Sequence, residues 1–354
     1  MKHVLYIGWI GYHNLGDELM FDLFKQQFSQ LGEDYKLDTV NNEKRYLDNA
    51  RIADYDLIVL GGGSILSGPD QLIQPYIIET LYRALQLNKK VMIWGSGIDW
   101  VPQSYIALDA PITWQASKEL KQKTSTVFKE SVWTGVRGPL THQVLQQCGI
   151  NDSIEVVSGD SAFLLEKGAT KEQKENIIGV NWGTSYQNIY GYDEITLENR
   201  LASALNQLIA KGYKIYFYLV WQADLDVTKR LCQKISNQQA ITLDEKIYYQ
   251  DDLIALMDRF SFTINFKLHA NYLSLAAQVP FIALGYRFKI YDFAASIDLS
   301  DMVIATDDNQ LADKILSLEQ QITTNQENIV DTMRQYQQMY QKKLVAPFQQ
   351  GLYL

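Results

Sequence analysis

The sequence has few cysteines and no long apolar run, and each shortage argues against a class of protein. Only Cys148 and Cys232 are present among 354 residues. They fall in separate predicted helices, so we expect no disulfide framework, and the cytoplasm is the compartment that fits best. No stretch approaches the ~18 apolar residues that a membrane helix needs. The apolar residues of Met1–Ile10 are not followed by a small-residue cleavage site, and we interpret them as a buried first strand rather than a signal peptide.

Positive charge is also scarce. Lysine and arginine number 32 against 41 acidic residues, which gives a formal net charge of −9. A nucleic-acid backbone is therefore repelled overall, and we expect no nucleic-acid partner. A pocket for one small anion stays open, because a few cations can dominate a cleft. The sequence shows no spacing typical of a metal site, so we expect no metal.

What the sequence does contain is a repeated alternation of short apolar runs and longer helical patterns. The length suggests two domains at roughly 150 residues each. Strands are predicted at 4–7, 57–60, 91–94, 132–136 and 154–157, and then at 177–180, 214–220, 240–243, 262–265 and 281–284. Helices are predicted at 17–31, 71–87, from 139 onward, and at 197–211, 224–235, 251–260, 268–278, 311–318 and 329–344. This alternation favours parallel sheets covered on both faces.

The polar segment Glu166–Glu175 is predicted to link the two halves. We therefore expect an α/β fold of two Rossmann-like, doubly wound domains that face a cleft. The N-terminal domain would span 1–168 and the C-terminal domain 175–325. We also expect a last helix within 326–354, which would be able to pack back on the N-terminal domain. Ligands of such sheets bind beyond the carboxyl ends of the strands, so the strand-end loops are the candidate sites.

Three glycine-rich loops follow predicted strands in the first half. One covers Gly8–Gly16 and leads into a helix that begins near Asp17, where free N–H groups suit an anion. It is neither a dinucleotide fingerprint nor a phosphate-binding P-loop, because both patterns are absent. The others are Gly61–Gly63 and Gly95–Gly97. Each alone is compatible with a tight turn, but together they indicate a surface where backbone meets ligand.

Cations also follow predicted strands. Arg137, just before Pro139, is placed either to bind a carboxylate or phosphate or to make a surface salt bridge. Lys267 and His269 lie near the start of a predicted helix, and Lys289 lies in the next strand-end loop. Two cations and a histidine around a helix start indicate a phosphate site, although a lone histidine in an α/β core is often structural.

Taken in order along residues 4–289, these segments resemble the polysaccharide pyruvyltransferase family. The shared features are a glycine-rich loop with a terminal acidic pair, a triple glycine, an arginine before a helix, an aspartate three residues before a phenylalanine, and a basic residue two before a histidine. Here they are Gly11–Glu18, Gly61–Gly63, Arg137, Asp160–Phe163 and Lys267–His269, followed by Pro280 and Lys289. Three positions depart from the family pattern: Lys267 replaces arginine, Ser161 replaces proline, and Gly138 replaces an acidic residue.

The resemblance implies a fold like that of the B-type glycosyltransferases. It also implies transfer of a pyruvyl group from phosphoenolpyruvate to two hydroxyls of a sugar in a cell-surface polysaccharide, such as an exopolysaccharide, or its precursor. A ketal forms and phosphate leaves. The donor-binding residues would be Lys267, Leu268, His269, Lys289 and Arg137. The acceptor-binding residues would be Asn14, Gly16, Asp17, Glu18, Gly62, Gly63 and Gly97.

Two catalytic roles follow from this chemistry. His269 would bind the leaving phosphate or protonate the vinyl carbon of the donor, because imidazolium is a suitable acid near neutral pH. Asp17 or Glu18 would accept the proton of a sugar hydroxyl. No cofactor is expected beyond phosphoenolpyruvate as co-substrate, and a lipid-linked acceptor would bring the chain to the inner face of the membrane.

Two other functions remain open at this point. One is a nucleotide-sugar glycosyltransferase of the same fold, in which Lys267 and Lys289 would hold a diphosphate. The other is a non-enzymatic relative that binds a sugar or an anion. Trp9, Tyr12 and Trp94 are candidates either for stacking on a sugar or for packing in the core.

Overall fold

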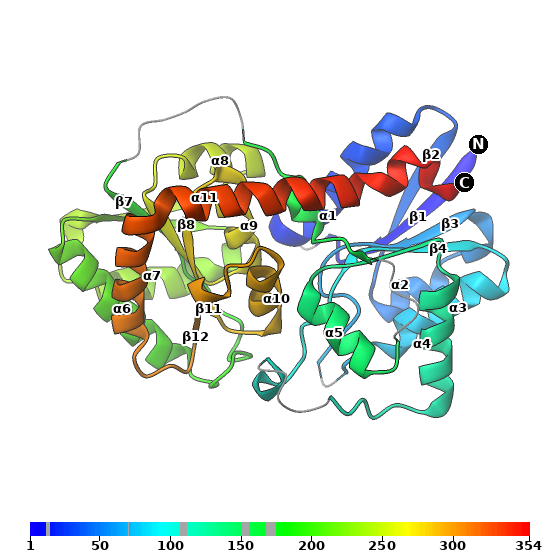
Figure 1. The fold of residues 1–354 in the computed structure, drawn as a ribbon, viewed down its shortest axis with the longest axis horizontal. Coiled ribbons are helices and arrows are strands. Elements are labelled where there is room, and N and C mark those ends of the chain that lie inside the picture. Colours follow the sequence, from blue (N-terminus) through cyan, green and yellow to red (C-terminus); the bar gives the residue numbers. More distant parts are fainter. Residues whose placement is uncertain (12–14, 70, 107–111, 151–155, 168–174) are drawn as a thin grey trace. The chain divides into compact units, whose positions relative to one another are not determined.

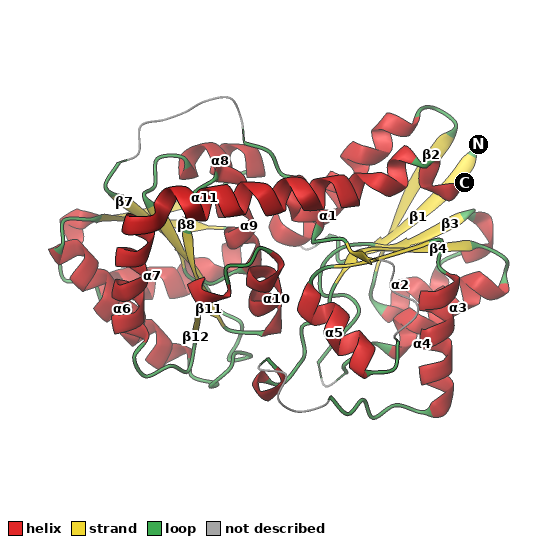
Figure 2. Cartoon of the chain, in the orientation of Figure 1, coloured by secondary structure: helices red, strands yellow, loops and turns green. Residues whose placement is uncertain are grey.

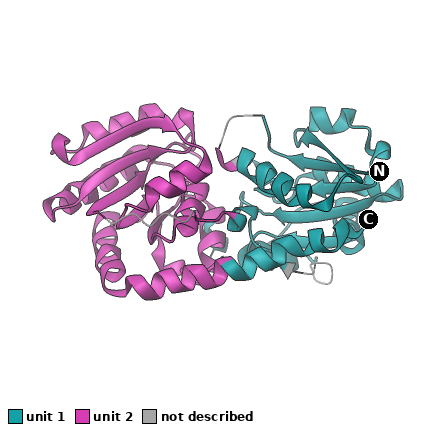
Figure 3. Cartoon of the chain, turned by 90° about the horizontal axis from the view of Figure 1, so that it is seen from above, with its two compact units in different colours: residues 1–13, 17–164, 338–354 teal, residues 14–16, 165–337 magenta. Residues whose placement is uncertain are grey.

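The computed structural model divides into two compact units, each built on its own sheet (Figures 1 and 3). The structure describes residues 1–11, 15–69, 71–106, 112–150, 156–167 and 175–354. Unit 1 comprises residues 1–13, 17–164 and 338–354, and unit 2 comprises residues 14–16 and 165–337. Each sheet has six strands, all parallel. The predicted fold of two parallel-sheet α/β domains is confirmed, and most of the predicted linker lies outside the described residues.

The sheet of unit 1 has the strand order β2-β1-β3-β4-β5-β6. Its strands are β1 (Lys2–Gly8), β2 (Tyr35–Asn41), β3 (Leu57–Leu60), β4 (Lys90–Ser96), β5 (Trp133–Val136) and β6 (Val156–Val157). Its helices are α1 (Leu15–Phe28), α2 (Lys44–Asn49), α3 (Pro75–Gln86), α4 (Lys118–Glu130) and α5 (Pro139–Gln147). Sequence analysis missed β2, an edge strand whose residues are half-buried or exposed, because it lacks the apolar run of a central strand. It also missed α2 and α4.

The sheet of unit 2 has the order β12-β11-β10-β7-β8-β9. Its strands are β7 (Ile177–Asn181), β8 (Lys214–Leu219), β9 (Ile241–Ile247), β10 (Phe262–Asn265), β11 (Phe281–Gly285) and β12 (Val303–Ala305). The helices are α6 (Glu194–Ala210), α7 (Leu225–Gln233), α8 (Gln250–Met257), α9 (Leu268–Ala277), α10 (Phe288–Ser296) and α11 (Leu311–Gln349). One expectation is corrected: Lys289 lies in the first turn of α10 rather than in a loop. The last two predicted helices, 311–318 and 329–344, lie within α11 on either side of non-helical backbone at Asn325.

Each sheet has one point where the strand order reverses. In unit 1 the reversal lies between β1 and β3, so the loop after Gly8 and the Gly61–Gly63 loop leave the sheet there. In unit 2 it lies between β7 and β10, so the loop after Asn181 and the start of α9 leave the sheet there. Connections run to opposite faces at such a point, and the crevice between them is where ligands of doubly wound sheets bind.

Figure 2 draws α11 as helix, and its last part, from Gln338 onward, belongs to unit 1 (Figure 3). Trp94 donates its indole N–H to the Leu344 carbonyl oxygen at 3.0 Å. The Phe348 ring packs edge-on against Trp94 and Phe24, with ring centroids 5.8 and 5.1 Å away. These residues of α11 therefore form part of the core of unit 1. Among the described helices, none is long and apolar enough to cross a membrane.

Candidate functional site at the strand-order reversal of unit 2

Two buried asparagines fix the start of α9. Asn181, at the end of β7, accepts the backbone N–H of Lys267 on its side-chain oxygen at 3.0 Å. Asn265, at the end of β10, donates to the carbonyl oxygen of Ala270 at 3.2 Å and accepts the Tyr218 hydroxyl at 2.6 Å. Lys267 is the N-cap residue of α9 and has extended backbone. The predicted donor motif is thus held at the carboxyl ends of the two strands that flank the reversal.

The Lys267 side chain turns toward the ends of β7 and β8. Its ammonium donates to the Thr184 carbonyl oxygen at 2.6 Å and lies 3.2 Å from an oxygen of Asp224. It also lies 4.9 Å from the centre of the Trp221 ring, a cation–π distance. Only 16% of the side chain is exposed. The positive charge at the start of α9 is therefore already matched by a buried carboxylate.

Asp224 is a member of this site that sequence analysis treated only as the start of a helix. Its side chain is fully buried, and its Oδ1 accepts the Thr184 N–H at 3.0 Å. A Cβ atom at position 183 would lie 2.5 Å from the Asp224 carboxyl carbon, so glycine is needed there. Burial raises the pKa of the Asp224 carboxyl above its usual range, and the Lys267 ammonium opposes that rise only in part. The available signal was an acidic residue shortly after a buried strand.

His269 lies in the first turn of α9 and is half-buried. Gly16, which groups with this unit, lies against it: a Cβ atom on Gly16 would be 1.9 Å from Nδ1 of the imidazole. The structure therefore brings together one predicted donor residue and one predicted acceptor residue. Leu268, between the two polar donor residues, is buried and packs into the unit.

Lys289 and Lys267 lie over neighbouring aromatic rings. The Lys289 ammonium is 5.3 Å from the centre of the Tyr286 ring, and the Lys267 ammonium is 5.6 Å from that of Phe266. The two rings stack with centroids 4.4 Å apart. Sequence analysis missed Arg287, the N-cap residue of α10, whose guanidinium lies 5.5 Å from the Tyr286 ring centre. Its position between a strand and a helix, like that of Lys267, was the available signal.

In unit 1, three predicted site residues form one packed arrangement. The guanidinium of Arg137 donates to the Ser64 hydroxyl at 2.8 Å and to the Ile98 carbonyl oxygen at 2.5 Å. A Cβ atom on Gly97 would lie 2.4 Å from the guanidinium carbon, and the Gly97 N–H donates to the Gly63 carbonyl oxygen at 2.8 Å. The surface salt bridge considered for Arg137 is wrong, because its side chain is fully buried. Its role in donor binding stays a prediction.

Glu18 and Gly62 also occupy defined positions in unit 1. The Glu18 carboxylate accepts the backbone N–H of Gly11 at 2.7 Å and so holds the first glycine loop to the start of α1. Gly62 lies against Ser161, whose hydroxyl oxygen would be 2.7 Å from a Cβ atom at position 62. Both contacts are structural, and the predicted acceptor roles of these two residues remain predictions.

The remaining residues predicted for the acceptor side divide into two groups. Tyr12, Asn14 and the side chain of Asp17 lie outside the described part of the chain. Trp94 is fully buried in the core, which decides between its two predicted uses, whereas Trp9 is 47% exposed.

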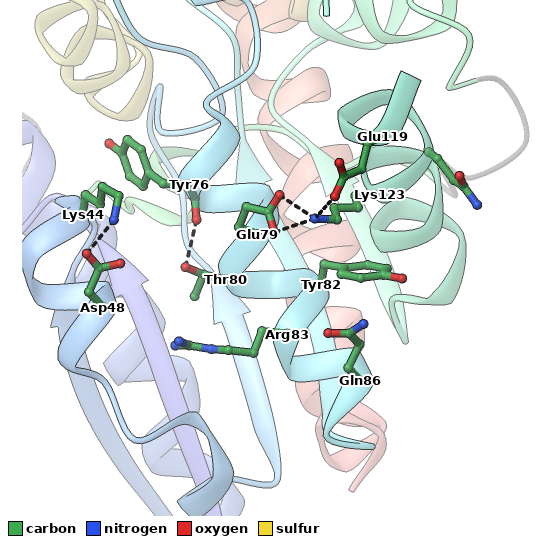
Figure 4. A pocket seen from close by; sticks show the side chains of 11 residues that line it. Lys44, Asp48, Tyr76, Glu79, Thr80, Tyr82, Arg83, Gln86, Glu119 and Lys123 are labelled. Atoms are coloured by element: carbon green, nitrogen blue, oxygen red, sulfur yellow. Dashed lines mark hydrogen bonds and ion pairs between the residues drawn. The ribbon is translucent and has the colours of Figure 1, made fainter. Parts of the chain in front are cut away.

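A pocket of about 650 Å³ lies over α2, α3 and α4 of unit 1 (Figure 4). Lys123 crosses part of it and pairs with Glu79 and Glu119 at 2.8 and 2.7 Å. None of the predicted site residues lines this pocket. Within the described ranges, no group of three histidine, cysteine or acidic residues is arranged to hold a metal ion.

The sequence was compared with models of known protein families. The model of the family described as polysaccharide pyruvyl transferase matches residues 14–287. The chain belongs to this family. The matched segment includes the first glycine loop from Asn14 onward and the start of α9, and it ends at Arg287. Among curated proteins, none matches the sequence.

Solved structures share the fold of this pyruvyl transferase family member over nearly its whole length. The Staphylococcus aureus MnaA–UDP structure superposes with a TM-score of 0.64 at 10% identity, covering 100% of this chain and 98% of that chain. The UDP-GlcNAc 2-epimerase of Neisseria meningitidis, bound to UDP-GlcNAc, gives 0.53 at 12% identity, covering 94% of each chain. Sucrose-phosphate synthase of Thermosynechococcus elongatus gives 0.55 at 10% identity, covering 100% and 98%. The fold is thus that of B-type glycosyltransferases and related epimerases.

Proposed function

We propose that this family member is a ketal-forming pyruvyltransferase. It moves the pyruvyl group of phosphoenolpyruvate onto two hydroxyls of a sugar in a cell-surface polysaccharide or its precursor, and it releases phosphate. The observation that carries the proposal is the position of Lys267 and His269 at the start of α9, beside the strand-order reversal and inside the matched segment. The reaction needs no cofactor besides the donor. The acceptor is lipid-linked at the cytoplasmic face of the membrane.

The donor carries a phosphate and a carboxylate, and unit 2 offers matching groups. The N–H groups of the first turn of α9 and the Lys267 ammonium suit one of the two anionic groups. Lys289 and Arg287, at the start of α10, supply further positive charge near the end of β11. Lysine at position 267 acts as a point charge rather than a planar fork, so it suits phosphate better than the two-oxygen grip on a carboxylate.

The chemical step needs one acid and one base. His269 gives a proton to the vinyl carbon of the donor, and the carbon that carries the phosphate becomes oxocarbenium-like. A sugar hydroxyl attacks that carbon and passes its proton to a carboxylate, for which we propose Asp17 or Glu18. The second hydroxyl then replaces the phosphate and closes the ketal, and its proton leaves on the released phosphate. The acceptor contacts of Asn14, Gly16, Gly62, Gly63 and Gly97 belong to the same proposal.

Use of a nucleotide sugar is the competing function, because two of the compared structures hold UDP or UDP-GlcNAc. Thermal-shift titrations with phosphoenolpyruvate, UDP and UDP-sugars separate the two functions. We expect phosphoenolpyruvate to raise the melting temperature and UDP to leave it unchanged. We then expect phosphate release with a working acceptor from a panel of β-galactosides and N-acetylmannosaminides.

A matched pair of variants assigns the binding to Lys267. Lys267→Met removes the ammonium at the start of α9 and should abolish the shift. Lys167→Met removes a lysine that pairs with a buried aspartate elsewhere in unit 2, Asp258, and should leave the shift intact. A shift with UDP-sugars but not with phosphoenolpyruvate would identify a glycosyltransferase. Tight sugar or anion binding without phosphate release on any acceptor would support a non-enzymatic relative.

A further inference from the structure

The buried Asp224 carboxylate uses its two oxygens unequally. Oδ1 accepts the Thr184 N–H at 3.0 Å and faces the Lys267 ammonium at 3.2 Å. Oδ2 is buried and has no hydrogen-bond partner within the described chain. A buried carboxylate oxygen without a donor is costly while the group is charged. A proton added to Oδ2 would remove the charge and leave both contacts of Oδ1 in place.

A second carboxylate faces the same loop. Glu194, at the start of α6, is buried and accepts the Thr184 hydroxyl at 2.7 Å and the Ser185 N–H at 2.7 Å. Its charge adds to the rise in the pKa of Asp224, after the larger effect of burial. Two carboxylates thus contact the loop after β7, and the Lys267 ammonium pairs with one of them, Asp224.

Two cations at the end of α7 are paired with another carboxylate. Arg230 and the C-cap residue Lys234 pair with the fully buried Glu198 of α6 at 2.8 and 2.6 Å. The pKa of the Arg230 guanidinium is raised mainly by Glu198 and to a smaller extent by the charge of Glu194, so Arg230 offsets part of the Glu194 charge. An anion that approaches Lys267 must compete with the Asp224 carboxylate for the same ammonium, which opposes its binding.

We propose that Asp224 couples anion binding at Lys267 to the uptake of one proton. The incoming anion pairs with the Lys267 ammonium, and Asp224 loses its charge by accepting a proton from solvent on Oδ2 while its Oδ1 contacts stay in place. For phosphoenolpyruvate as the anion, this rests on the proposed function. For a simple oxyanion such as sulfate it does not, because sulfate needs only the Lys267 charge and the α9 N–H groups.

The proton uptake determines whether the affinity for the anion rises or falls with pH. Where Asp224 is charged in the free protein and neutral in the complex, each bound anion takes up one proton, and the affinity falls up to about tenfold per pH unit. Below that range Asp224 is neutral in both states and the affinity is flat. His269, in the first turn of α9, is a second titratable group near this site. Its contribution must be separated by substitution.

Calorimetric titration measures this proton uptake directly. Sulfate, which does not titrate between pH 5 and 9, is titrated into the full chain in buffers of different ionisation enthalpy. We expect a net uptake of up to one proton per sulfate in the wild type and in His269→Gln. Asp224→Asn should abolish the uptake and make sulfate binding at pH 8 tighter than in the wild type. Asp258→Asn, which changes an aspartate paired with Lys167, is the control and should keep the uptake.

Specific outcomes would overturn the proposal. Sulfate binding to the wild type with no buffer-dependent heat between pH 5 and 8 would do so without any variant. Uptake that persists in Asp224→Asn, or sulfate affinity unchanged in Lys267→Met, would do so as well. The proposed function is tested separately. It would be wrong if phosphoenolpyruvate neither binds nor turns over, even where sulfate binding still takes up a proton. Thermal unfolding of each variant checks that it is folded.

Discussion

Arg137 and Lys267 have equivalent places in the sequence, each between a buried strand and a helix, yet the fold gives them different surroundings. Arg137 is enclosed completely, and its guanidinium bonds to Ser64 and Ile98 within unit 1. Lys267 keeps part of its side chain exposed and shares its charge with Asp224. An arginine that is enclosed among loops and a lysine that stays partly exposed look alike in the sequence, because burial depends on distant neighbours.

The residue-scale prediction concerns His269. His269→Gln keeps a hydrogen-bond donor and most of the size of the side chain, so a purely structural role should survive it with a small loss. If His269 gives the proton to the donor, turnover should fall by about 10²-fold or more. Phosphate release on a working acceptor is the measurement, and His142→Gln, a half-buried histidine in α5, is the control. A nearly normal rate in His269→Gln would remove this residue from the mechanism.

At the scale of elements, α11 serves both units. Its first part packs within unit 2, where Lys211 pairs with Glu319 at 2.7 Å and Gln278 donates to the side-chain oxygen of Gln337 at 2.9 Å. Its last part supplies Phe348 and Tyr340 to the core of unit 1. The non-helical backbone at Asn325 falls in the first part. Because the two units share this helix, the core of unit 1 needs residues from the end of α11.

Phe348→Ala tests that dependence. The ring is 93% buried, so its loss should lower the free energy of unfolding by about 3–5 kcal/mol, from lost burial and the cavity left beside Trp94 and Phe24. Gln335→Ala, an exposed position on the same helix, should change it by less than about 0.5 kcal/mol. Urea denaturation measures both. Similar midpoints and slopes for the two variants would show that the end of α11 contributes little to the core.

At the scale of the molecule, the two sheets have different strand orders and therefore different reversal points. In unit 1 the glycine loops after β1 and β3 occupy that point, and in unit 2 the charged start of α9 occupies it. Backbone dominates the first and charged side chains dominate the second. This division fits an acceptor met by main chain in one unit and an anionic donor met by cations in the other, as proposed above.

Amide hydrogen exchange with saturating phosphoenolpyruvate tests the assignment of the donor to unit 2. We expect slower exchange at the start of α9 and in the loop after β7, because bound anion restrains the N–H groups there. Peptides of α3 and α4, which line the pocket of Figure 4, should exchange at the same rate with and without the donor. Protection confined to α3 and α4 would move the donor site to that pocket.

By itself, the sequence determined the number and kind of sheets and the family. Because central parallel strands are covered on both faces, their sequences are short apolar runs. One example is Leu57–Leu60, which is fully buried. The family follows from motifs in a fixed order, which needs no structure. The edge strand β2 and the short strand β12 escaped prediction, because partly exposed or very short strands lack that apolar signature.

Only the tertiary structure decided which charges meet. Asp224 and Lys267 are 43 positions apart, and no local pattern links an acid after β8 to the N-cap of α9. They meet because β8, β7 and β10 are neighbours in the sheet, which brings their carboxyl ends to one edge. Periodicity and propensity are local properties, whereas charge balance at a site is set by strand order. The chemistry of Lys267 therefore depends on a partner that only the folded chain supplies.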